Sequence, residues 1–240
     1  MKFIAHRGAC LEETEDTLAS LEKAAEYGAY AVECDPRYTK DGVAVLFHDN
    51  DLRRLADNES RVDEITYEEM KEILSSKGLA LTTLDELIKN YKGKSAVLLD
   101  LSFRATDPEF FRKMSEAPFR IIVGVHAPDE AETASKYFAK ENILAFMPHP
   151  EDIEAFSDAG AGIIRLWEHW LVNTPVSEAR KKIPADTEIW IMTCDKSIHH
   201  PLYCMDGSEE QIEKIKEMGA DGMLLNNIKL AHELRISKTE

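Results

Sequence analysis

Eight short apolar segments, separated by amphipathic stretches, restrict the fold of this 240-residue chain more than any other feature. Each segment is rich in Ile, Val or Leu and is continuous rather than alternating, as is typical of strands covered on both faces. Eight such strands alternating with helices predict a (β/α)8 (TIM) barrel that forms one domain over residues 1–240, with an open doubly wound sheet as the alternative. The segments are 3–5, 29–35, 95–101, 120–125, 143–147, 162–167, 188–194 and 222–225.

The stretches between these segments carry signals for the start of helices. Thr66 with Glu69 and Ser208 with Gln211 each have the spacing of a capping box. No G-x-G-x-x-G sequence follows a strand, so a dinucleotide site has no support.

One segment after the second strand interrupts the alternation. Asp41-Gly42 stands between two β-rich runs and is typical of a hairpin turn, so we expect a hairpin and a small insertion over about 36–82. A turn centred on these two residues would place His48 opposite Asp35. His48 would then also lie near Glu33, two residues away along the strand.

The charge of the chain excludes some classes of partner. With 45 acidic and 29 basic residues its net charge is -16, which disfavours binding to nucleic acid.

The chain contains no run of 18 apolar residues, so the sequence predicts no membrane span. Residues 3–5 run directly into a polar motif without the pattern of a signal peptide, so we expect a cytoplasmic protein. The four cysteines have no C-x-x-C spacing, which argues against structural zinc and a disulfide framework.

Carboxylates lie near the carboxyl ends of two predicted strands, at the end of the barrel where functional residues are found. Glu33 and Asp35 share one face of their strand, and Asp100 interrupts an otherwise apolar strand. Because buried carboxylates that approach one another need a cation between them, these residues predict an oxygen-ligand site for Mg²⁺ or Ca²⁺.

Two histidines and an arginine are expected beside this site. His6 follows the first strand and His48 ends the hairpin, and two imidazoles can exchange general acid and base roles near neutral pH. Arg7 offers a fork for phosphate oxygens, although it has an equally good interpretation as a bridge between the barrel carboxylates. A divalent cation, two histidines and an arginine together suit phosphodiester cleavage.

Other polar and aromatic residues at strand ends have less specific interpretations. Arg165 and Asp195 also end strands, and Trp167 and Trp170 suit either core packing or the wall of a pocket. Four further histidines follow strands and are expected at the surface or behind the site: His126, His149, His199 and His200.

Motifs in the first part of the chain resemble, in order and spacing, those of the glycerophosphodiester phosphodiesterase family. They are His6-Arg7-Gly8, Glu33-Cys34-Asp35, TKDGVAVLFHD (39–49) and Leu52-Arg53-Arg54, followed by similar sequences at 62–73 and 83–87. The resemblance is specific over roughly the first 100 residues and weak beyond. It implies a barrel fold, catalytic His6 and His48, and a divalent cation bound by the acidic residues Glu33, Asp35 and Asp100.

The chain departs from the family pattern at several positions. The family usually has P-E-N-T after the first strand, where this chain has T-E-D-T (14–17). It usually has E-x-K in the third strand, where this chain has Asp100 and Ser102. The family's final D-G-I-x-T-D ends here in Asn226. Lys196 is the residue that we expect to supply the missing positive charge to the phosphate.

The sequence therefore predicts a metal-dependent phosphodiesterase that acts on a small molecule. The family's usual substrate is a glycerophosphodiester, cleaved to sn-glycerol 3-phosphate and an alcohol. The nucleophile is either water or a neighbouring hydroxyl of the substrate, which would give a cyclic phosphate first. The same chemistry on a lysophospholipid or another phosphodiester is one alternative, and a non-catalytic barrel that binds a metal or an anion is another. No heptad run or repeat indicates an oligomer interface.

Overall fold

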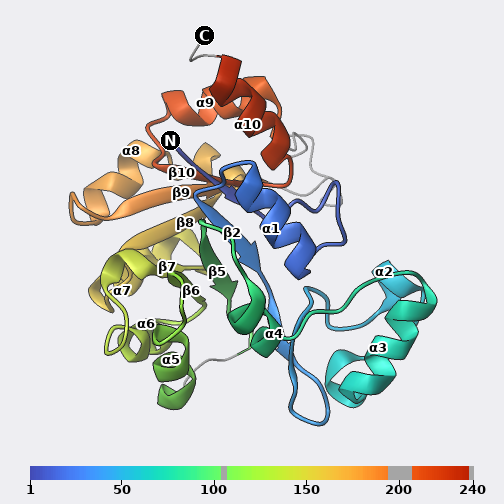
Figure 1. The fold of residues 1–240 in the computed structure, drawn as a ribbon. Helices are drawn as coiled ribbons and strands as arrows, with labels where there is room; N and C mark the ends of the chain where they lie inside the picture. Colours follow the sequence, from blue (N-terminus) through green and yellow to red (C-terminus); the bar gives the residue numbers. More distant parts are fainter. Residues whose placement is uncertain (104–106, 194–206, 238–240) are drawn as a thin grey trace.

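A closed barrel of parallel strands forms the centre of the computed structural model, which describes residues 1–103, 107–193 and 207–237. The first strand pairs in parallel with both the second and the last strand, and this closes the barrel. The predicted TIM barrel is thus confirmed, and helices surround it in Figure 1. The barrel strands are β1 (Lys2–Ala5), β2 (Ala31–Cys34), β5 (Ala96–Asp100), β6 (Ile121–Val125), β7 (Ile143–Ala145), β8 (Ile163–Trp167), β9 (Glu188–Met192) and β10 (Gly222–Leu225).

Side chains at the helix N-termini determine where several helices begin. Thr17, Thr66 and Thr83 each cap a helix in a complete capping box. Ser208 also caps its helix, but the Gln211 side chain accepts a hydrogen bond from the Gly207 N–H instead of that of Ser208. The helices around the barrel are α1 (Leu18–Glu26), α4 (Leu84–Asn90), α5 (Pro108–Ser115), α6 (Pro128–Ala134), α7 (Ile153–Asp158), α8 (Val176–Ala179), α9 (Glu209–Glu217) and α10 (Ile228–Ser237).

Alternate residues of each barrel strand pack on opposite sides of the sheet. Ile4, Ala31 and Leu98 belong to the apolar cluster inside the barrel, whereas Cys34 and Leu99 pack in the cluster between strands and helices. At the carboxyl ends, the inward positions of six strands hold His6, Glu33, Asp100, His126, Arg165 and Asn226, while those of β7 and β9 hold Phe146 and Met192. The strand pattern therefore gathers polar side chains on most sides of the barrel mouth.

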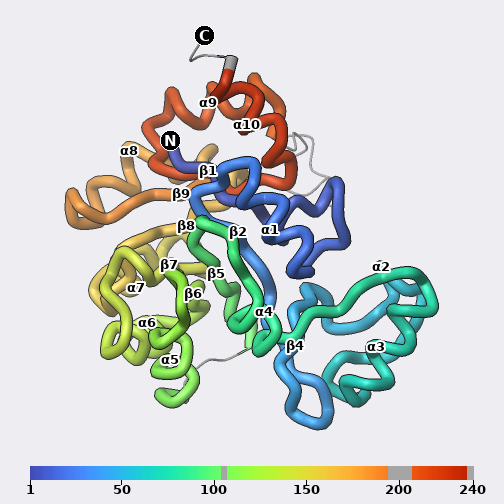
Figure 2. The backbone as a smooth tube through the Cα atoms, in the orientation of Figure 1, coloured from blue at the N-terminus to red at the C-terminus, as the bar shows by residue number. Residues whose placement is uncertain are grey.

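The excursion after β2 has an apolar cluster of its own. Strands β3 (Pro36–Tyr38) and β4 (Ala44–Leu46) form the expected hairpin, which confirms that element of the fold. Helices α2 (Arg53–Ala56) and α3 (Tyr67–Ser76) follow and lie to one side of the barrel in Figure 2. The cluster consists of Val45, Phe47, Leu52, Ala56, Val62, Met70 and Leu74.

The hairpin register differs by one residue from the expected one. Tyr38 pairs with Ala44, and the Thr39 N–H donates to the Val43 carbonyl oxygen at 3.0 Å, so residues 40–42 form a three-residue loop with Gly42 at φ 80°. A loop that ends in a left-handed glycine needs one residue more than the expected two-residue turn, which shifts every pair. The prediction that His48 lies opposite Asp35 is therefore wrong: the Phe47 N–H donates to the Asp35 carbonyl oxygen at 2.8 Å.

Among the helices that the structure describes, none has both the length and the apolar character needed to cross a membrane.

Candidate active site

Three carboxylates meet at the carboxyl ends of β2 and β5. Glu33 and Asp35 are 1% and 2% exposed. One oxygen of each, together with one oxygen of Asp100, lies within 4.8 Å of the others. In the described residues this is the one group of acidic, histidine or cysteine side chains with a spacing that suits a metal ion. The structure thus brings together the three residues expected to bind a cation.

Burial and mutual repulsion raise the pKa values of this cluster. Burial, reinforced by the charge of Asp100, raises the pKa of Asp35 from 3.8 to about 6. Burial and the neighbouring charge of Asp35 raise the pKa of Glu33 well above its usual value. Oδ2 of Asp35 is buried and accepts no hydrogen bond from the described residues. A cation would stabilise all three carboxylates, so the donor set fits a hard divalent ion.

Arg7 lies against the acidic cluster with its backbone in the left-handed region at φ 55°. Its N–H donates to Oε2 of Glu33 at 2.7 Å. Its side chain is buried, with Nε 3.8 Å from Oδ2 of Asp35 and Nη1 3.3 Å from Oε1 of Glu15. Although burial would lower it, the charges of Asp35 and Glu15 raise the pKa of Arg7. These contacts match the bridging interpretation, and phosphate binding by Arg7 stays a prediction.

His6 is buried beside this cluster in its neutral form. Its Nδ1 donates to Oδ1 of Asn226 at 2.7 Å, which leaves a lone pair on Nε2. Burial, reinforced by the positive charge of Arg7, lowers the pKa of His6 from 6.5 to about 3. A neutral imidazole with a free Nε2 is equipped to accept a proton.

His48 stands in the opposite electrostatic setting. Its side chain is 40% exposed, and its Nδ1 donates to Oδ1 of Asp49 at 2.7 Å. Burial alone would raise the pKa of Asp49, but hydrogen bonds from His48 and Arg54 lower it to about 2. A carboxylate at Nδ1 fixes the orientation of the ring and leaves Nε2 for proton transfer. Among the lesser causes that lower the pKa values of His6 and Asp35 is an electrostatic interaction with His48, so the three residues are close enough to interact.

Some expected site residues lie outside the described part of the chain. These are Lys196, Asp195, His199 and His200. Ser102, which stands where the family usually has lysine, is exposed just after β5.

The buried side chain of Arg165 lies between two tryptophan rings. Its guanidinium carbon is 4.5 Å from the centroid of the Trp167 ring and 5.4 Å from that of the Trp170 ring, so both tryptophans pack around this cation.

A comparison with models of protein families identifies the family of this chain. Residues 6–146, more than half of the chain, match the model of the Glycerophosphoryl diester phosphodiesterase family. The chain belongs to this family. The matched segment contains His6, His48 and all three carboxylates of the cluster.

Relatives of the glycerophosphodiester phosphodiesterase family match mainly in one segment. Glycerophosphodiester phosphodiesterase 1 of Rattus norvegicus is 43% identical over 70 residues, which are 29% of this chain and 21% of the relative. A glycerophosphodiester phosphodiesterase of Caldanaerobacter subterraneus is 40% identical over 70 residues, 29% of each protein. The match thus spans less than a third of the length of these relatives.

Solved structures with the same fold align with nearly the whole of this chain. A putative glycerophosphoryl diester phosphodiesterase from Agrobacterium tumefaciens has a TM-score of 0.77 at 17% identity and covers 100% of this chain and 98% of its own. The glycerophosphodiester phosphodiesterase from Thermotoga maritima has a TM-score of 0.69 at 21% identity and covers 97% of each chain. At these identities the comparison establishes the fold.

The structure adds residues to which the sequence interpretation gave no role. Glu15 joins Arg7 to Arg54, and Arg54 Nε donates to Oδ2 of Asp49 at 2.6 Å. A continuous polar chain therefore runs from His48 to the acidic cluster. Glu15, Asp49 and Arg54 all stand inside family motifs, so a signal for them was present, although the motif gave no contacts. His126 contacts Asp100 and was indicated by its position at a strand end, whereas Asn226 contacts His6 and was indicated by its place in the family's final motif.

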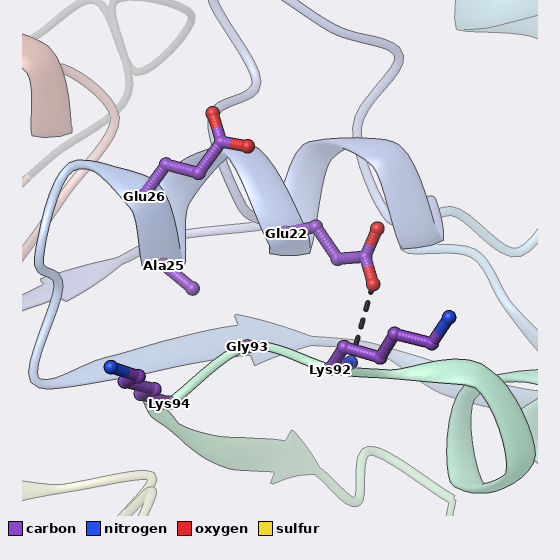
Figure 3. A pocket seen from close by; sticks show the side chains of 6 residues that line it. All are labelled: Glu22, Ala25, Glu26, Lys92, Gly93 and Lys94. Carbon is purple, nitrogen blue, oxygen red and sulfur yellow. Dashed lines mark hydrogen bonds between the residues drawn. The ribbon is translucent and has the colours of Figure 1, made fainter.

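A cavity of about 390 Å³ between α1 and the segment before β5 lies away from this site. Figure 3 shows its lining side chains, with the Lys92 N–H donating to Glu22 at 3.2 Å. Because Lys92, Gly93 and Lys94 precede β5, the cavity lies at the amino end of the strands. It is therefore at the opposite end of the barrel from the three carboxylates.

Gly8 is required for the turn that carries His6 and Arg7. Its φ is 74°, and a Cβ atom there would lie 2.6 Å from the backbone carbon of Ser20. We expect Gly8→Ala to lower the free energy of unfolding by about 2–4 kcal/mol, because backbone strain and overpacking both contribute. Urea denaturation measures this. Gly42→Ala is the matched control, since φ there is 80° and nothing lies within 4 Å. Equal losses in the two variants would contradict the close approach.

Proposed function

We propose that this chain is a metal-dependent phosphodiester hydrolase that cleaves glycerophosphodiesters to sn-glycerol 3-phosphate and an alcohol. The observation that carries the proposal is the cluster of buried Glu33 and Asp35 with half-buried Asp100, near one buried and one partly exposed imidazole. Membership of the family and the relatives' names support the same reaction. A related phosphodiesterase from Oleispira antarctica, with a TM-score of 0.68 at 19% identity and 97% of each chain covered, was solved in complex with the product sn-glycerol-3-phosphate.

Glu33, Asp35 and Asp100 would hold a divalent cation, Mg²⁺ or Ca²⁺. Such an ion, when bound, withdraws negative charge from the phosphoryl oxygens. Arg7 contributes a fixed positive charge on the protein side of the cluster, where it contacts Asp35. The carboxylates, the arginine and the cation together make the barrel mouth able to accept an anionic phosphodiester.

His6 and His48 divide the proton transfers between them. Nε2 of His6 takes the proton from the nucleophile, which is water or a neighbouring hydroxyl of the substrate, as a new P–O bond forms. The bond from phosphorus to the departing alcohol breaks, and His48 gives its Nε2 proton to the alkoxide oxygen. The lone pair on His6 Nε2 and the carboxylate beside His48 Nδ1 support this assignment.

A substrate panel tests the proposal. The purified protein is incubated with glycerophosphocholine, glycerophosphoethanolamine and a lysophosphatidylcholine in Mg²⁺, Ca²⁺ or EDTA, and products are followed by ³¹P NMR. We expect glycerol 3-phosphate from the first two substrates in metal and none in EDTA. His48→Ala should lose this turnover and exposed His149→Ala should keep it, which excludes a contaminating enzyme. Turnover of the lysolipid alone would indicate the lysophospholipid alternative, and no metal-dependent turnover would indicate a non-catalytic barrel.

A further inference from the structure

His126, at the end of β6, is bound to one of the three carboxylates. Asp100 pairs with Gly124 in the parallel register of β5 and β6, so His126 is two residues beyond on the same face. Its Nε2 donates to Oδ1 of Asp100 at 2.5 Å. His126 itself does not belong to the group of side chains spaced for a metal ion, and its Nε2 contacts one member of that group.

The surrounding fold holds this imidazole in a fixed orientation. The ring stacks on Phe146 with a centroid distance of 5.4 Å and an interplanar angle of 17°. Gly124 makes the stack possible, since a Cβ atom there would lie 2.3 Å from the Phe146 ring. The backbone N–H of His126 also donates to Oε2 of buried Glu130 at 2.8 Å. The ring and its backbone are therefore both fixed before any ligand arrives.

Asp100 reaches less far than the residue that the family usually has at this position. Glu33 accepts a backbone N–H from Arg7, whereas Asp100 is one methylene shorter than the usual family glutamate. A carboxylate with one oxygen held by an imidazole presents its other oxygen in a fixed direction, and hydrogen bonds of this kind orient metal ligands. We propose that His126 is a positioning residue that holds Asp100 for cation binding. The inference depends on the proposed function, because it assumes that the cluster binds a cation.

Two amide variants that differ by one methylene test this role. In the His126→Gln variant the side-chain amide nitrogen reaches about as far as Nε2 of histidine and keeps a donor for Asp100. In the His126→Asn variant the side chain is too short to reach Asp100. Isothermal titration of the full-length, EDTA-treated protein with Mg²⁺ or Ca²⁺ measures the Kd. We expect His126→Asn to raise the Kd by about 10–100-fold and His126→Gln to stay within a few-fold of wild type. Exposed His149→Asn is the matched control and should leave the Kd unchanged.

The outcomes separate this inference from the proposed function. If wild type binds neither cation, the proposed function is overturned and this inference with it. If wild type binds and His126→Asn has the same Kd, the inference alone is wrong. Equal weakening in both amide variants would also overturn it, because that result assigns the effect to ring packing on Phe146. The melting temperature without metal verifies that each variant folds.

Discussion

Replacing Asp35 by asparagine is expected to abolish turnover and, at the same time, to make the metal-free protein more stable. Loss of a charged ligand removes several kcal/mol of transition-state stabilisation, so kcat/KM should fall by about 10³-fold or more. The stability gain follows from the pKa of Asp35, which burial and the charge of Asp100 raise to about 6. At about 1.4 kcal/mol per pKa unit, the ionised carboxylate costs about 2–3 kcal/mol at pH 8.

The pH dependence of this gain has a definite sign. The pKa of Asp35 is about 6 in the folded protein and near 3.8 when unfolded. Its contribution to stability is therefore fully present below pH 3.8 and is lost as the pH rises through 6. Thermal melts in EDTA should show the variant above wild type at pH 8, with the difference closing toward pH 4.

Asp41→Asn is the matched control for this experiment. Asp41 is exposed, and hydrogen bonds from Thr39 and Tyr67 lower its pKa, so neutralising it should not raise stability. The metal affinity and turnover of the Asp41→Asn variant should equal those of wild type. A less stable Asp35→Asn variant at pH 8, or one that retains metal-dependent turnover, would contradict the assignment of Asp35 to a strained cation site.

Replacing His6 by alanine is the second large effect that we expect. General base catalysis contributes about 10²–10⁴-fold, and kcat should fall by that factor with metal affinity retained, because His6 is not among the clustered ligands. Burial and Arg7 lower the pKa of His6 to about 3, so the imidazole is neutral in the free protein. A bound phosphodiester anion favours the protonated form, which helps the ring to accept a proton during the reaction. Steady-state kinetics in saturating Mg²⁺ measure the loss.

The titration of His6 provides an independent measurement. Because its pKa is lowered from 6.5 to about 3, ¹H–¹⁵N spectra should show a neutral ring well below pH 6. The contribution of His6 to the stability of the protein should fall as the pH drops from 6.5 toward 3, since the unfolded chain takes up this proton first. Asn226→Asp places a carboxylate at Nδ1 and should raise the pKa. A ring that titrates near 6.5 in wild type would contradict the proposed role.

Local patterns were enough to predict the residues of the acidic cluster. The alternation of a strand places Glu33 and Asp35 on one face, and the interruption of an apolar run marks Asp100, because both signals act within a few residues. The hairpin was predictable for the same reason, whereas its register was not. The difference between a two-residue and a three-residue loop depends on the left-handed conformation of Gly42 and on the Thr39–Asp41 hydrogen bond.

The alternation of strands and helices, the family motifs and the residue types at each strand end are all visible in the amino-acid sequence. Which of these side chains touch depends on the folded barrel. His6 meets Asn226 because the closing pair of β1 and β10 joins the two ends of the chain, and His126 meets Asp100 because β6 lies beside β5. Such contacts depend on how the whole barrel closes, and no pattern within a single strand or helix encodes that geometry.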